Sequence, residues 1–572
     1  MTTMDRTGVA PALEQIASYL ELQGENAFRV RAFTAAAKTV QGFPGDLASA
    51  LVDGSLAEAK GIGPAILQVV TELVSTGQCT MLEQLRTEVP AGLVEMLGIS
   101  GLGVAKIRQI RDALGIESLP ELEVAARDGR LAALPRFGAR TAENILKGIA
   151  FLRQASEWRL SHHAHDEATA LREAFLRLPH VLAAHVAGDV RRRCEVVRDV
   201  VIVLVADIPP IELLRQLEAI PGVKEIAGED ERRATLRFAG GGTVQVLVTP
   251  PQNLGAVLVQ ATGSQAHLTS LAARATTRGF NLAGTALWEG SRFVATPTEE
   301  SLYAALDLPW IPPELREGGE EIGRPVPELV EGRDLRGFLH CHTTYSDGTM
   351  TLAELATACR LEGYEYVGVT DHSRTAAYAG GLSPDRIRAQ WVEIDEVNRT
   401  SKGTHLLKGV ESDILVDGAL DYPEDILAGF DFIIGSIHSR FNLSEAEQTE
   451  RVCRAMASRY LTIIGHPTGR LLLSRAGYQI DLDRVLAAAA KHEVAIEINA
   501  DPHRLDLDWR MLARARAMGV MISIGADAHS VAGLANMSYG VGVARKGGLG
   551  PDDVLNCRSV EGFLAFAQAR RS

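Results

Sequence analysis

Six histidines and three acidic residues in the C-terminal part of the chain carry the side chains that divalent cations prefer as ligands. Imidazole nitrogens combined with carboxylate oxygens suit Zn²⁺, Mn²⁺ or Fe²⁺. Water bound to clustered cations becomes acidic enough to attack a phosphate ester near neutral pH, while neighbouring cations neutralise the phosphate oxygens. This segment is therefore predicted to hydrolyse phosphate esters. The nine candidate ligands are His340, His342, Asp347, His372, Glu411, His438, His466, Asp527 and His529.

Short apolar segments, expected to be buried strands, alternate in this region with amphipathic stretches such as 352–361, expected to be helices. The alternation predicts a β/α barrel, which places its chemistry where strands end. In His340-Cys341-His342, side chains two residues apart on a strand share a face. Both histidines can therefore hold one ion while Cys341 faces away. The expected strands are 366–369, 432–434, 461–464, 495–498 and 520–524.

Each candidate also has an interpretation without a metal. A single histidine at a strand end is more often a hydrogen-bonded structural residue, and Asp347 before Gly348 suits a turn. Six of the fifteen histidines, however, converge with three acids at five expected strand ends. This convergence favours a cation site.

With these motifs, the segment from about Asp334 to Arg571 resembles a PHP (polymerase and histidinol phosphatase) domain. The resemblance implies up to three divalent ions, Mn²⁺ or Zn²⁺, with Glu411 as a bridging ligand. Arg440 and Arg470, shortly after His438 and His466, are candidate contacts to DNA phosphates or are simply solvated. The implied ligand sets are His340, His342, Glu411 and Asp527 for one ion, Glu411, His438 and His466 for the second, and Asp347, His372 and His529 for the third.

Length and composition bound the rest of the chain. At 572 residues it is too long for one hydrophobic core, so several domains are expected. No run of eighteen apolar residues and no basic-then-apolar start is present, so we expect no membrane span and a cytoplasmic location. The six cysteines form no C-x-x-C pair, which argues against a disulfide framework or a zinc ribbon. The net charge of −14 does not exclude DNA, because phosphate contacts need only local positive potential.

Residues 10–150 are expected to form short amphipathic helices, and two glycine motifs mark turns between them. Gly61-Ile62-Gly63 and Gly101-Leu102-Gly103 each separate two helical stretches, as in a helix-hairpin-helix. Such a turn directs backbone amides at a DNA phosphate without side-chain charge. The alternative is an ordinary helix C-cap. Arg136-Phe137-Gly138 lacks the first glycine and is not counted as a third turn.

Residues 10–315 resemble a bacterial family X DNA polymerase, and the union of such a core with a PHP domain is the layout of that bacterial family. The resemblance rests on the hairpin motifs and on the stretches 22–29, 262–267 and 310–317. It implies an all-α helix-hairpin-helix N-terminal region, an α/β nucleotidyltransferase-like palm and thumb, and a C-terminal β/α (distorted TIM-like) PHP barrel. The implied domains are lyase-like helical 1–85, fingers 86–150, palm 151–250, thumb 251–315, linker 316–333 and PHP 334–572.

The palm departs from this family at its catalytic residues. Asp199 matches the first of three metal-binding acids, but Val201 stands at the second and Gln245 at the third. Valine cannot ligate, and a neutral amide is a poor substitute for a carboxylate between two dications. In the motif that would meet the triphosphate (Gly188, Asp189, Arg191 and Arg192), Asp189 replaces a serine and either repels phosphate or serves as a substitute ligand. We expect a palm that binds DNA but synthesises DNA poorly or not at all. Its affinity for Mg²⁺ or Mn²⁺ should be low.

The lyase activity of the family is also not expected. Its Schiff-base lysine would fall in the helix after Gly63, but residues 64–70 contain no lysine. Lys60 lies close by in the sequence and is interpreted as a surface residue.

The leading hypothesis is a monomeric DNA repair protein whose PHP domain is a 3′-5′ exonuclease on gapped, nicked or recessed DNA. Removal of 3′ phosphates and cleavage at abasic sites are possible additional activities. Three alternatives stay open: a bifunctional polymerase and exonuclease with a rescued palm, a small-molecule phosphatase, and a non-catalytic DNA-binding scaffold.

Overall fold

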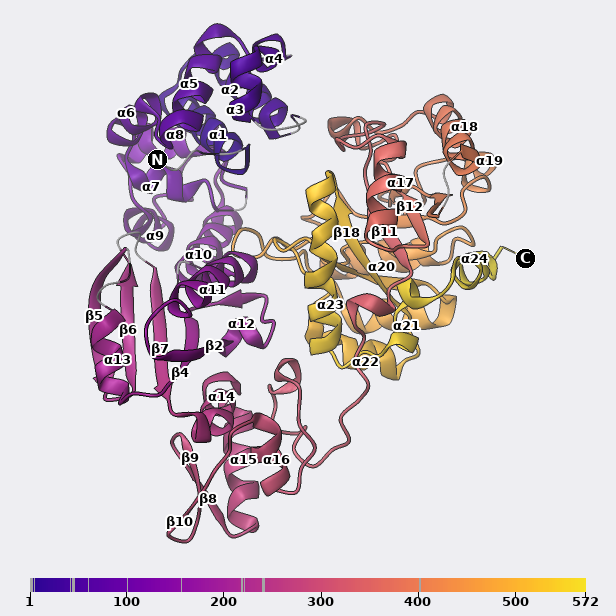
Figure 1. The fold of residues 1–572 in the computed structure, drawn as a ribbon. Coiled ribbons are helices and arrows are strands. Elements are labelled where there is room, and N and C mark those ends of the chain that lie inside the picture. Colours follow the sequence, from indigo (N-terminus) through magenta and orange to yellow (C-terminus); the bar gives the residue numbers. More distant parts are fainter. Residues whose placement is uncertain are drawn as a thin grey trace. The chain divides into compact units, whose positions relative to one another are not determined.

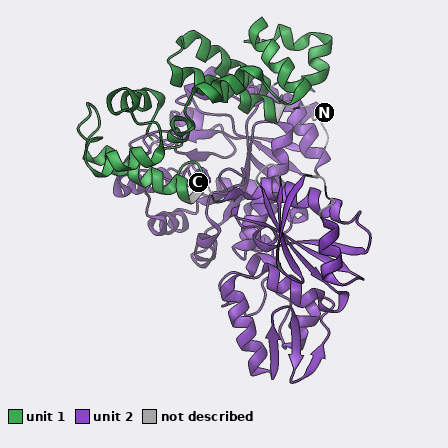
Figure 2. Ribbon diagram, turned by 90° about the vertical axis from the view of Figure 1, so that its left-hand side faces the viewer, with its two compact units in different colours: residues 1–157, 473–475 green, residues 158–472, 476–572 purple. Residues whose placement is uncertain are grey.

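The computed structural model describes residues 4–571 except 5, 42, 44–46, 60, 100, 156, 218–219, 221, 239–241 and 401–402. Lys60 thus lies outside the described residues. The chain divides into two compact units, residues 1–157 with 473–475, and residues 158–472 with 476–572 (Figure 2). In the described part of the chain, no helix combines the length and apolar character needed to cross a membrane.

The first unit is all-helical, as its sequence predicts (Figure 1). Leu13, Ile16 and Leu20, which recur at helical spacing, are buried, and so are Ile107 and Ile110. These side chains belong to one continuous apolar core. The helices are α1 (Arg6–Gln23), α2 (Ala27–Gln41), α3 (Leu47–Asp53), α4 (Ser55–Glu58), α5 (Pro64–Thr76), α6 (Thr80–Glu88), α7 (Ala91–Met96), α8 (Val104–Leu114), α9 (Leu119–Arg127) and α10 (Ala139–Ala155).

The second unit begins with a five-stranded sheet in the order β2-β4-β7-β6-β5, in which only β4 and β7 run parallel. The apolar run near residue 200 forms the central strand β4, and its side chains alternate between two faces. Ile202 and Leu204 pack in the core that contains residues of α11 and α13, whereas Val203 packs with α14. The elements are β1 (Arg159–Leu160), α11 (Ser161–Phe175), β2 (Val181–Ala187), α12 (Gly188–Arg191), β3 (Val196–Val197), β4 (Val200–Ala206), α13 (Pro210–Gln216), β5 (Val223–Asp230), β6 (Arg233–Phe238) and β7 (Thr243–Thr249).

A small α/β region follows, with a three-stranded antiparallel sheet in the order β10-β9-β8. The linker predicted at 316–333 is packed at both ends. Arg316 is fully buried and its Nη1 donates to Glu299 Oε1 at 2.7 Å, and Val330 is buried in the core of the next domain. Arg316, Glu317 and Glu321 each have a buried partner, which composition alone does not reveal. The elements are α14 (Leu254–Thr262), α15 (Gln265–Thr277), β8 (Phe280–Ala283), β9 (Ala286–Glu289), β10 (Arg292–Val294) and α16 (Glu299–Ala305).

The C-terminal domain contains one parallel sheet of eight strands in the order β13-β12-β11-β18-β17-β16-β15-β14. The end strands β13 and β14 are separated by only residues 409–410, so the sheet must curl until its two ends meet. This confirms the predicted distorted barrel. The strands are β11 (Gly337–Cys341), β12 (Tyr366–Val369), β13 (His405–Lys408), β14 (Glu411–Asp413), β15 (Ile434–Ser436), β16 (Ile463–Ile464), β17 (Ala495–Asn499) and β18 (Ile522–Ala528).

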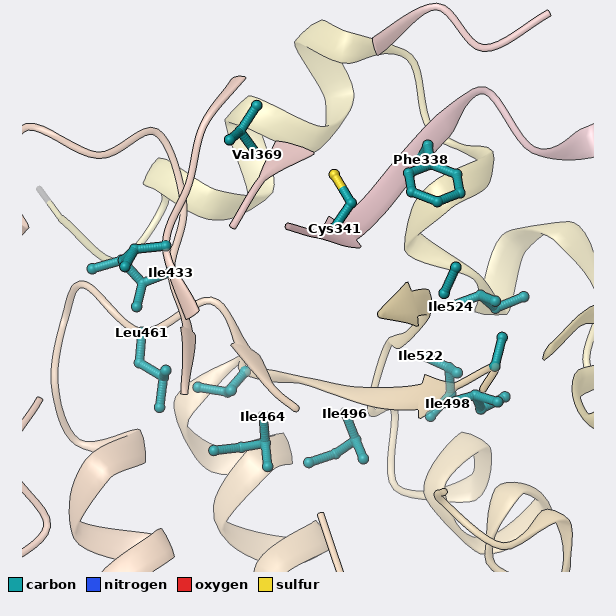
Figure 3. Packing of buried hydrophobic residues seen from close by; sticks show 14 of the residues in the cluster. Phe338, Cys341, Val369, Ile433, Leu461, Ile464, Ile496, Ile498, Ile522 and Ile524 are labelled. Atoms are coloured by element: carbon teal, nitrogen blue, oxygen red, sulfur yellow. The ribbon is translucent and has the colours of Figure 1, made fainter. Parts of the chain in front are cut away.

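Helices follow most of these strands, and apolar side chains fill the space between helices and sheet. Ile496 and Ile498 of β17 join Ile522 and Ile524 of β18 in this core (Figure 3). Because side chains alternate along a strand, residues such as Glu497 must face the other side of the sheet. The helices are α17 (Leu352–Leu361), α18 (Pro384–Thr400), α19 (Glu424–Leu427), α20 (Glu445–Met456), α21 (Leu482–His492), α22 (Leu512–Ala517), α23 (Met537–Lys546) and α24 (Val560–Gln568).

Candidate metal centre

The nine predicted ligands converge at one edge of the C-terminal sheet, where β11, β12, β13, β15, β16 and β18 end. His340 lies in β11, Glu411 begins β14, and Asp527 lies near the end of β18. The other six lie in the loops that follow β11, β12, β15, β16 and β18. The ends of parallel strands meet at one edge of a sheet, which explains why residues nearly 200 positions apart are brought together.

Glu411 lies at the centre of this cluster. Its side chain is 1% exposed, and five histidines approach its two carboxylate oxygens. Burial by itself would raise the pKa of Glu411, but the imidazoles around it, led by His438 and His340, hold that pKa well below its usual range. The carboxylate is therefore ionised. Its oxygens lie 2.9 Å from His466 Nε2, 2.9 Å from His372 Nδ1, 3.2 Å from His438 Nε2, 3.4 Å from His340 Nε2 and 3.6 Å from His342 Nε2.

Two further carboxylates flank the histidines. Asp527 Oδ1 lies 3.1 Å from His342 Nε2 and 3.6 Å from His340 Nε2. Asp347 Oδ1 lies 3.4 Å from His529 Nε2. Burial would raise the pKa of Asp527, but the charge of His340 and the hydrogen bond from His342 hold it well below its usual range. The site thus places ionised carboxylates between imidazoles, the donor set of a borderline divalent cation.

The geometry of the donor atoms fits divalent metals. Buried His340 Nε2 and His342 Nδ1 have no hydrogen-bond partner among the residues that the structure describes. Buried polar atoms are rarely left without a partner, and a divalent cation in this cluster would supply one for these two. Four sets of donor atoms lie within 4.8 Å of one another: His342, Asp347, His372 and His529; His340, His466 and Asp527; His340, His342 and Glu411; and His372, Glu411 and His438.

These sets match the implied division of ligands only in part. Asp347, His372 and His529 share one set, as implied for the third ion, but His342 joins them. His466 is grouped with His340 and Asp527, although it also contacts Glu411. The assignment of each ligand to an ion stays a prediction.

The expected strand geometry at His340 was wrong, although both histidine rings reach the cluster. His340 has φ of +62°, and the pairing register of β11 shifts on both sides around it. His342 follows the end of the strand. The two rings therefore share a direction because of a bulge rather than regular alternation. Cys341 faces the core, where its thiol donates to the Gly368 carbonyl.

Two buried carboxylates that the sequence analysis missed orient the ligands. Glu497 Oε1 contacts His340 Nδ1, and Glu497 Oε2 accepts from the backbone amide of His466 at 2.7 Å. Asp413 Oδ1 lies 2.6 Å from His438 Nδ1. A carboxylate on the far nitrogen of an imidazole fixes its tautomer and ring orientation. A single acid between apolar residues in the expected strand 495–498 was the available signal for Glu497.

We predict that Glu497→Gln weakens metal binding without removing a ligand. The amide cannot hold His340 in one tautomer as the carboxylate does, so Mn²⁺ affinity should fall about 10- to 100-fold. Isothermal titration calorimetry, in which Mn²⁺ is added to the metal-free protein, measures this change in affinity. Glu365→Gln is the control, because Glu365 is 44% exposed and pairs with Arg336 just before β12, at the opposite edge of the sheet. Equal Mn²⁺ affinities for both variants would contradict the orienting role.

The two predicted arginine contacts have different outcomes. The side chain of Arg470 is largely buried, and its guanidinium donates to Asp508 Oδ2 at 2.7 Å and to the Arg504 carbonyl at 2.9 Å. Internal acceptors engage three of its N–H groups, which disfavours the predicted phosphate contact. Arg440, two residues after His438, is exposed. It stays a candidate phosphate contact.

The Asp199 carboxylate contacts an amide and a hydroxyl. Its Oδ2 accepts from Gln245 Nε2 at 3.3 Å and its Oδ1 accepts from the Thr243 hydroxyl at 3.3 Å. Val201 pairs with Gln245 across β4 and β7 and packs in the apolar cluster with Ala187. Within the described residues, no set of metal donors includes Asp199. The Gln245 amide and the apolar Val201 side chain thus stand at the two positions where the family resemblance implies further metal-binding acids.

The arginines of the predicted phosphate-binding loop form ion pairs with carboxylates of the same chain. Arg191 donates to both carboxylate oxygens of Glu299, at 2.7 and 2.8 Å. Arg192 contacts Asp189 and donates from its Nε to Glu317 Oε1 at 2.8 Å. Gly188 has φ of +66°, and a Cβ atom there would lie 2.9 Å from Val201. The two arginines are neutralised by carboxylates, so they form no free basic patch.

Within the second unit, the same loop also contacts the C-terminal domain. Glu195 Oε1 accepts from Arg510 at 2.7 Å, and its Oε2 accepts from Trp509 Nε1 at 3.2 Å. Lys546 of α23 donates to the Arg192 carbonyl at 3.0 Å. The loop that resembles a nucleotide-binding motif is therefore held by ion pairs and hydrogen bonds.

Among its described residues, the first unit contains three equivalent turns rather than two. Gly61, Gly101 and Arg136 have φ of +90°, +81° and +69°, and the apolar residue after each is buried. In each turn the amide of that apolar residue donates to a carbonyl three residues before it. Leaving out the Arg136 turn was therefore wrong, since arginine adopts the left-handed conformation here despite its Cβ atom. The glycine that follows precedes α5, α8 and α10, respectively.

Comparisons with known proteins agree with this architecture. Family models match residues 4–79 (helix-hairpin-helix domain), 93–150 (SAM-like helix-hairpin-helix tandem), 257–317 (DNA polymerase beta thumb) and 339–501 (PHP domain). The tandem model includes both Gly101 and Arg136.

Curated relatives match either nearly the whole chain or about two fifths of it. A DNA polymerase/3′-5′ exonuclease PolX of Bacillus subtilis (strain 168) is 36% identical over 569 residues, 98% of this chain and 99% of the relative. A probable phosphatase of Thermoanaerobacter sp. (strain X514) is 30% identical over 230 residues, 38% of this chain and 88% of the relative. A probable phosphatase of Vibrio parahaemolyticus serotype O3:K6 is 28% identical over 245 residues, 40% of this chain and 92% of the relative. The chain therefore belongs to the PolX family, the bacterial family X DNA polymerases that carry a C-terminal PHP domain.

Proposed function

We propose that this protein processes DNA ends in repair and that its PHP domain is a metal-dependent 3′-5′ exonuclease. The observation that carries the proposal is the convergence of nine donor residues around Glu411 at one edge of the sheet. The Bacillus subtilis relative is named as a DNA polymerase/3′-5′ exonuclease, which supports the proposal. Removal of 3′ phosphates and cleavage at abasic sites use the same hydrolysis and belong to this proposal.

In the proposed hydrolysis, some residues of the cluster hold cations and others orient the ligands. Divalent cations, Mn²⁺ or Zn²⁺ in our proposal, supply the acidity that activates water and the positive charge that neutralises phosphate oxygens. Glu411, Asp347 and Asp527 hold them, while Glu497 and Asp413 orient the imidazoles. Water adds to phosphorus, the bond from phosphorus to the 3′ oxygen of the preceding nucleotide breaks, and this oxygen takes a proton. Exposed Arg440 is placed in the proposal as a phosphate contact.

In this proposal the polymerase-like core holds DNA but does not extend it. The pairing of Asp199 with the Gln245 amide and the neutralised Arg191 and Arg192 support this assignment. DNA is held by the three turns at Gly61, Gly101 and Arg136, whose following helices offer free backbone amides to phosphates. Gapped, nicked or recessed ends are the substrates that such a combination fits.

A 5′-labelled recessed primer tests the proposal. With Mn²⁺, the natural chain should shorten the primer, the double variant His340→Ala, His342→Ala should not, and added dNTPs should produce no extension by either protein. Shortening of the primer by the double variant would show that the nuclease activity does not reside in the PHP domain. Robust extension would show that the palm works.

A small-molecule phosphatase is the second candidate, because probable phosphatases match 38–40% of this chain and residues 339–501 match the PHP domain model. Comparing kcat/KM for a free phosphate monoester with that for the recessed primer separates the two candidates. We expect the primer to be the better substrate, because only DNA engages the N-terminal turns.

We predict that Gly63→Asp weakens DNA binding without unfolding its helix. Gly63 is the N-cap of α5 with φ of −85°, and a Cβ atom there meets nothing within 4 Å. Aspartate is a favoured N-cap, yet its carboxylate occupies the amides that would bind phosphate and repels that anion. Loss of one charge-assisted hydrogen bond corresponds to a rise in Kd of about 10- to 100-fold.

Fluorescence anisotropy with gapped DNA at fixed salt measures this change. Gly63→Ser is the matched control, because serine also caps the helix but carries no charge. Gly103→Asp should behave like Gly63→Asp, since Gly103 caps α8 with φ of −76°. Unchanged affinity in both aspartate variants would exclude the turns at Gly61 and Gly101 from DNA binding.

A further inference from the structure

An exposed aromatic ring lies directly beside the ligand cluster. Tyr378 belongs to the 3-10 turn Ala377–Ala379 and is 68% exposed. Its ring centroid lies 6.3 Å from that of His372 and 6.5 Å from that of His438, with interplanar angles of 53° and 74°. Neither imidazole stacks on the tyrosine ring. A large apolar surface is therefore left open at the edge of the site.

The loop that carries Tyr378, residues 373–382, is fixed at both ends. Ser373 and Leu382 form a bridge, and the Leu382 amide donates to the His372 carbonyl at 2.9 Å. The Tyr422 hydroxyl donates to the Leu382 carbonyl at 2.6 Å. One end of the loop thus directly adjoins a ligand of the cluster.

The middle of the loop is fixed as well. The Thr375 hydroxyl donates to Asp413 Oδ2 at 2.7 Å, and Asp413 also contacts His438. Arg386 donates to the Gly380 carbonyl at 2.9 Å. The neighbours of Tyr378 on both sides are therefore tied to the structure around the cluster. A ring on such a support loses little conformational entropy when a flat ligand covers it.

We propose that Tyr378 is a positioning residue that stacks on the nucleobase of the terminal nucleotide while its phosphate lies at the metal cluster. This inference rests on the proposed nuclease function and names how the site distinguishes a nucleotide from other phosphate esters. In a nucleotide, one sugar separates the base from the phosphate. The Tyr378 ring lies at a comparable short distance from the cluster, because its centroid is 6.3 Å from that of His372 and 6.5 Å from that of His438. Stacking on an aromatic ring accepts every base, as exonuclease action on any sequence requires.

The test is a double-mutant cycle in which the tyrosine ring is removed from the protein and the base is removed from the primer, singly and together. Two 5′-labelled recessed primers are compared, one ending in an ordinary nucleotide and one ending in a tetrahydrofuran residue that has no base. The proteins are the natural chain, Tyr378→Leu and Tyr378→Phe. Leu361→Ala is the control, because Leu361 is 73% exposed at the end of α17, before β12, and thus at the opposite edge of the sheet.

For the ordinary primer, Tyr378→Leu should lower kcat/KM about 5- to 100-fold, the range of one base–aromatic stack, whereas Tyr378→Phe keeps the activity. For the primer without a terminal base, Tyr378→Leu should change kcat/KM less than about twofold, because no stack exists to lose. Leu361→Ala should leave both rates unchanged. The Mn²⁺ content of Tyr378→Leu should equal that of the natural chain.

Equal losses by Tyr378→Leu on both primers would overturn the proposal, since the ring would then support the loop rather than the base. No loss on the ordinary primer would overturn it as well. If the natural chain shortened neither primer, the proposed nuclease function itself would fail, which is a different result from either of these.

Discussion

Glu411→Gln is expected to reduce DNA hydrolysis by about a thousandfold or more, a loss of roughly 4 kcal/mol of transition-state stabilisation. The variant keeps the size and hydrogen-bonding shape of the side chain. It removes the one negative charge that five imidazoles approach within 3.6 Å. In the ligand division that the family resemblance implies, two cations share Glu411, and both would lose a ligand. The loss should therefore appear in kcat and in the number of bound ions.

The measurement combines single-turnover degradation of a recessed primer with metal analysis of the dialysed protein. Glu365→Gln serves as the control here too, because it makes the same chemical change at an exposed position. Normal degradation by Glu411→Gln, with a full complement of ions, would show that Glu411 is not a bridging ligand.

The second large effect is expected at the palm. The natural chain should not extend a primer, whereas the triple variant Asp189→Ser, Val201→Asp, Gln245→Asp should extend it at least about 100-fold faster than the natural chain, as two-metal transfer needs its carboxylates. Val201 and Gln245 are paired across β4 and β7, and Gln245 already contacts Asp199. Three carboxylates would therefore lie together without a change of fold. The Asp189→Ser change also removes one of the two carboxylate partners of Arg192, the other being Glu317.

The extension assay uses the Glu411→Gln background, so that degradation does not hide synthesis. Adding Asp199→Asn to the triple variant should abolish the restored extension, which distinguishes the palm from a contaminating polymerase. Extension by the natural chain would show that it recruits other ligands. A triple variant that binds Mn²⁺ at the palm without extending the primer would show that the neutralised Arg191 is a second block.

The sequence alone determined the chemistry of both sites, because that chemistry depends on which residue types are present. The nine donor residues follow short apolar segments, and parallel strands bring such positions to one edge of a sheet whatever the order of the strands. The defects at Val201 and Gln245 are likewise visible in the sequence, since neither side chain offers a carboxylate. The expected helix 352–361 and strand 366–369 agree with the structure because their apolar periodicity is local.

Only the tertiary structure decided which groups touch. The central place of Glu411, the support from Glu497 and Asp413, and the internal use of Arg470 all join residues far apart in the chain. Such contacts depend on strand order and on the course of loops, which single-sequence patterns do not encode. The third turn at Arg136 was missed for a related reason. Surrounding contacts hold a non-glycine residue at a positive φ there, and this stabilisation is not visible in the residue type.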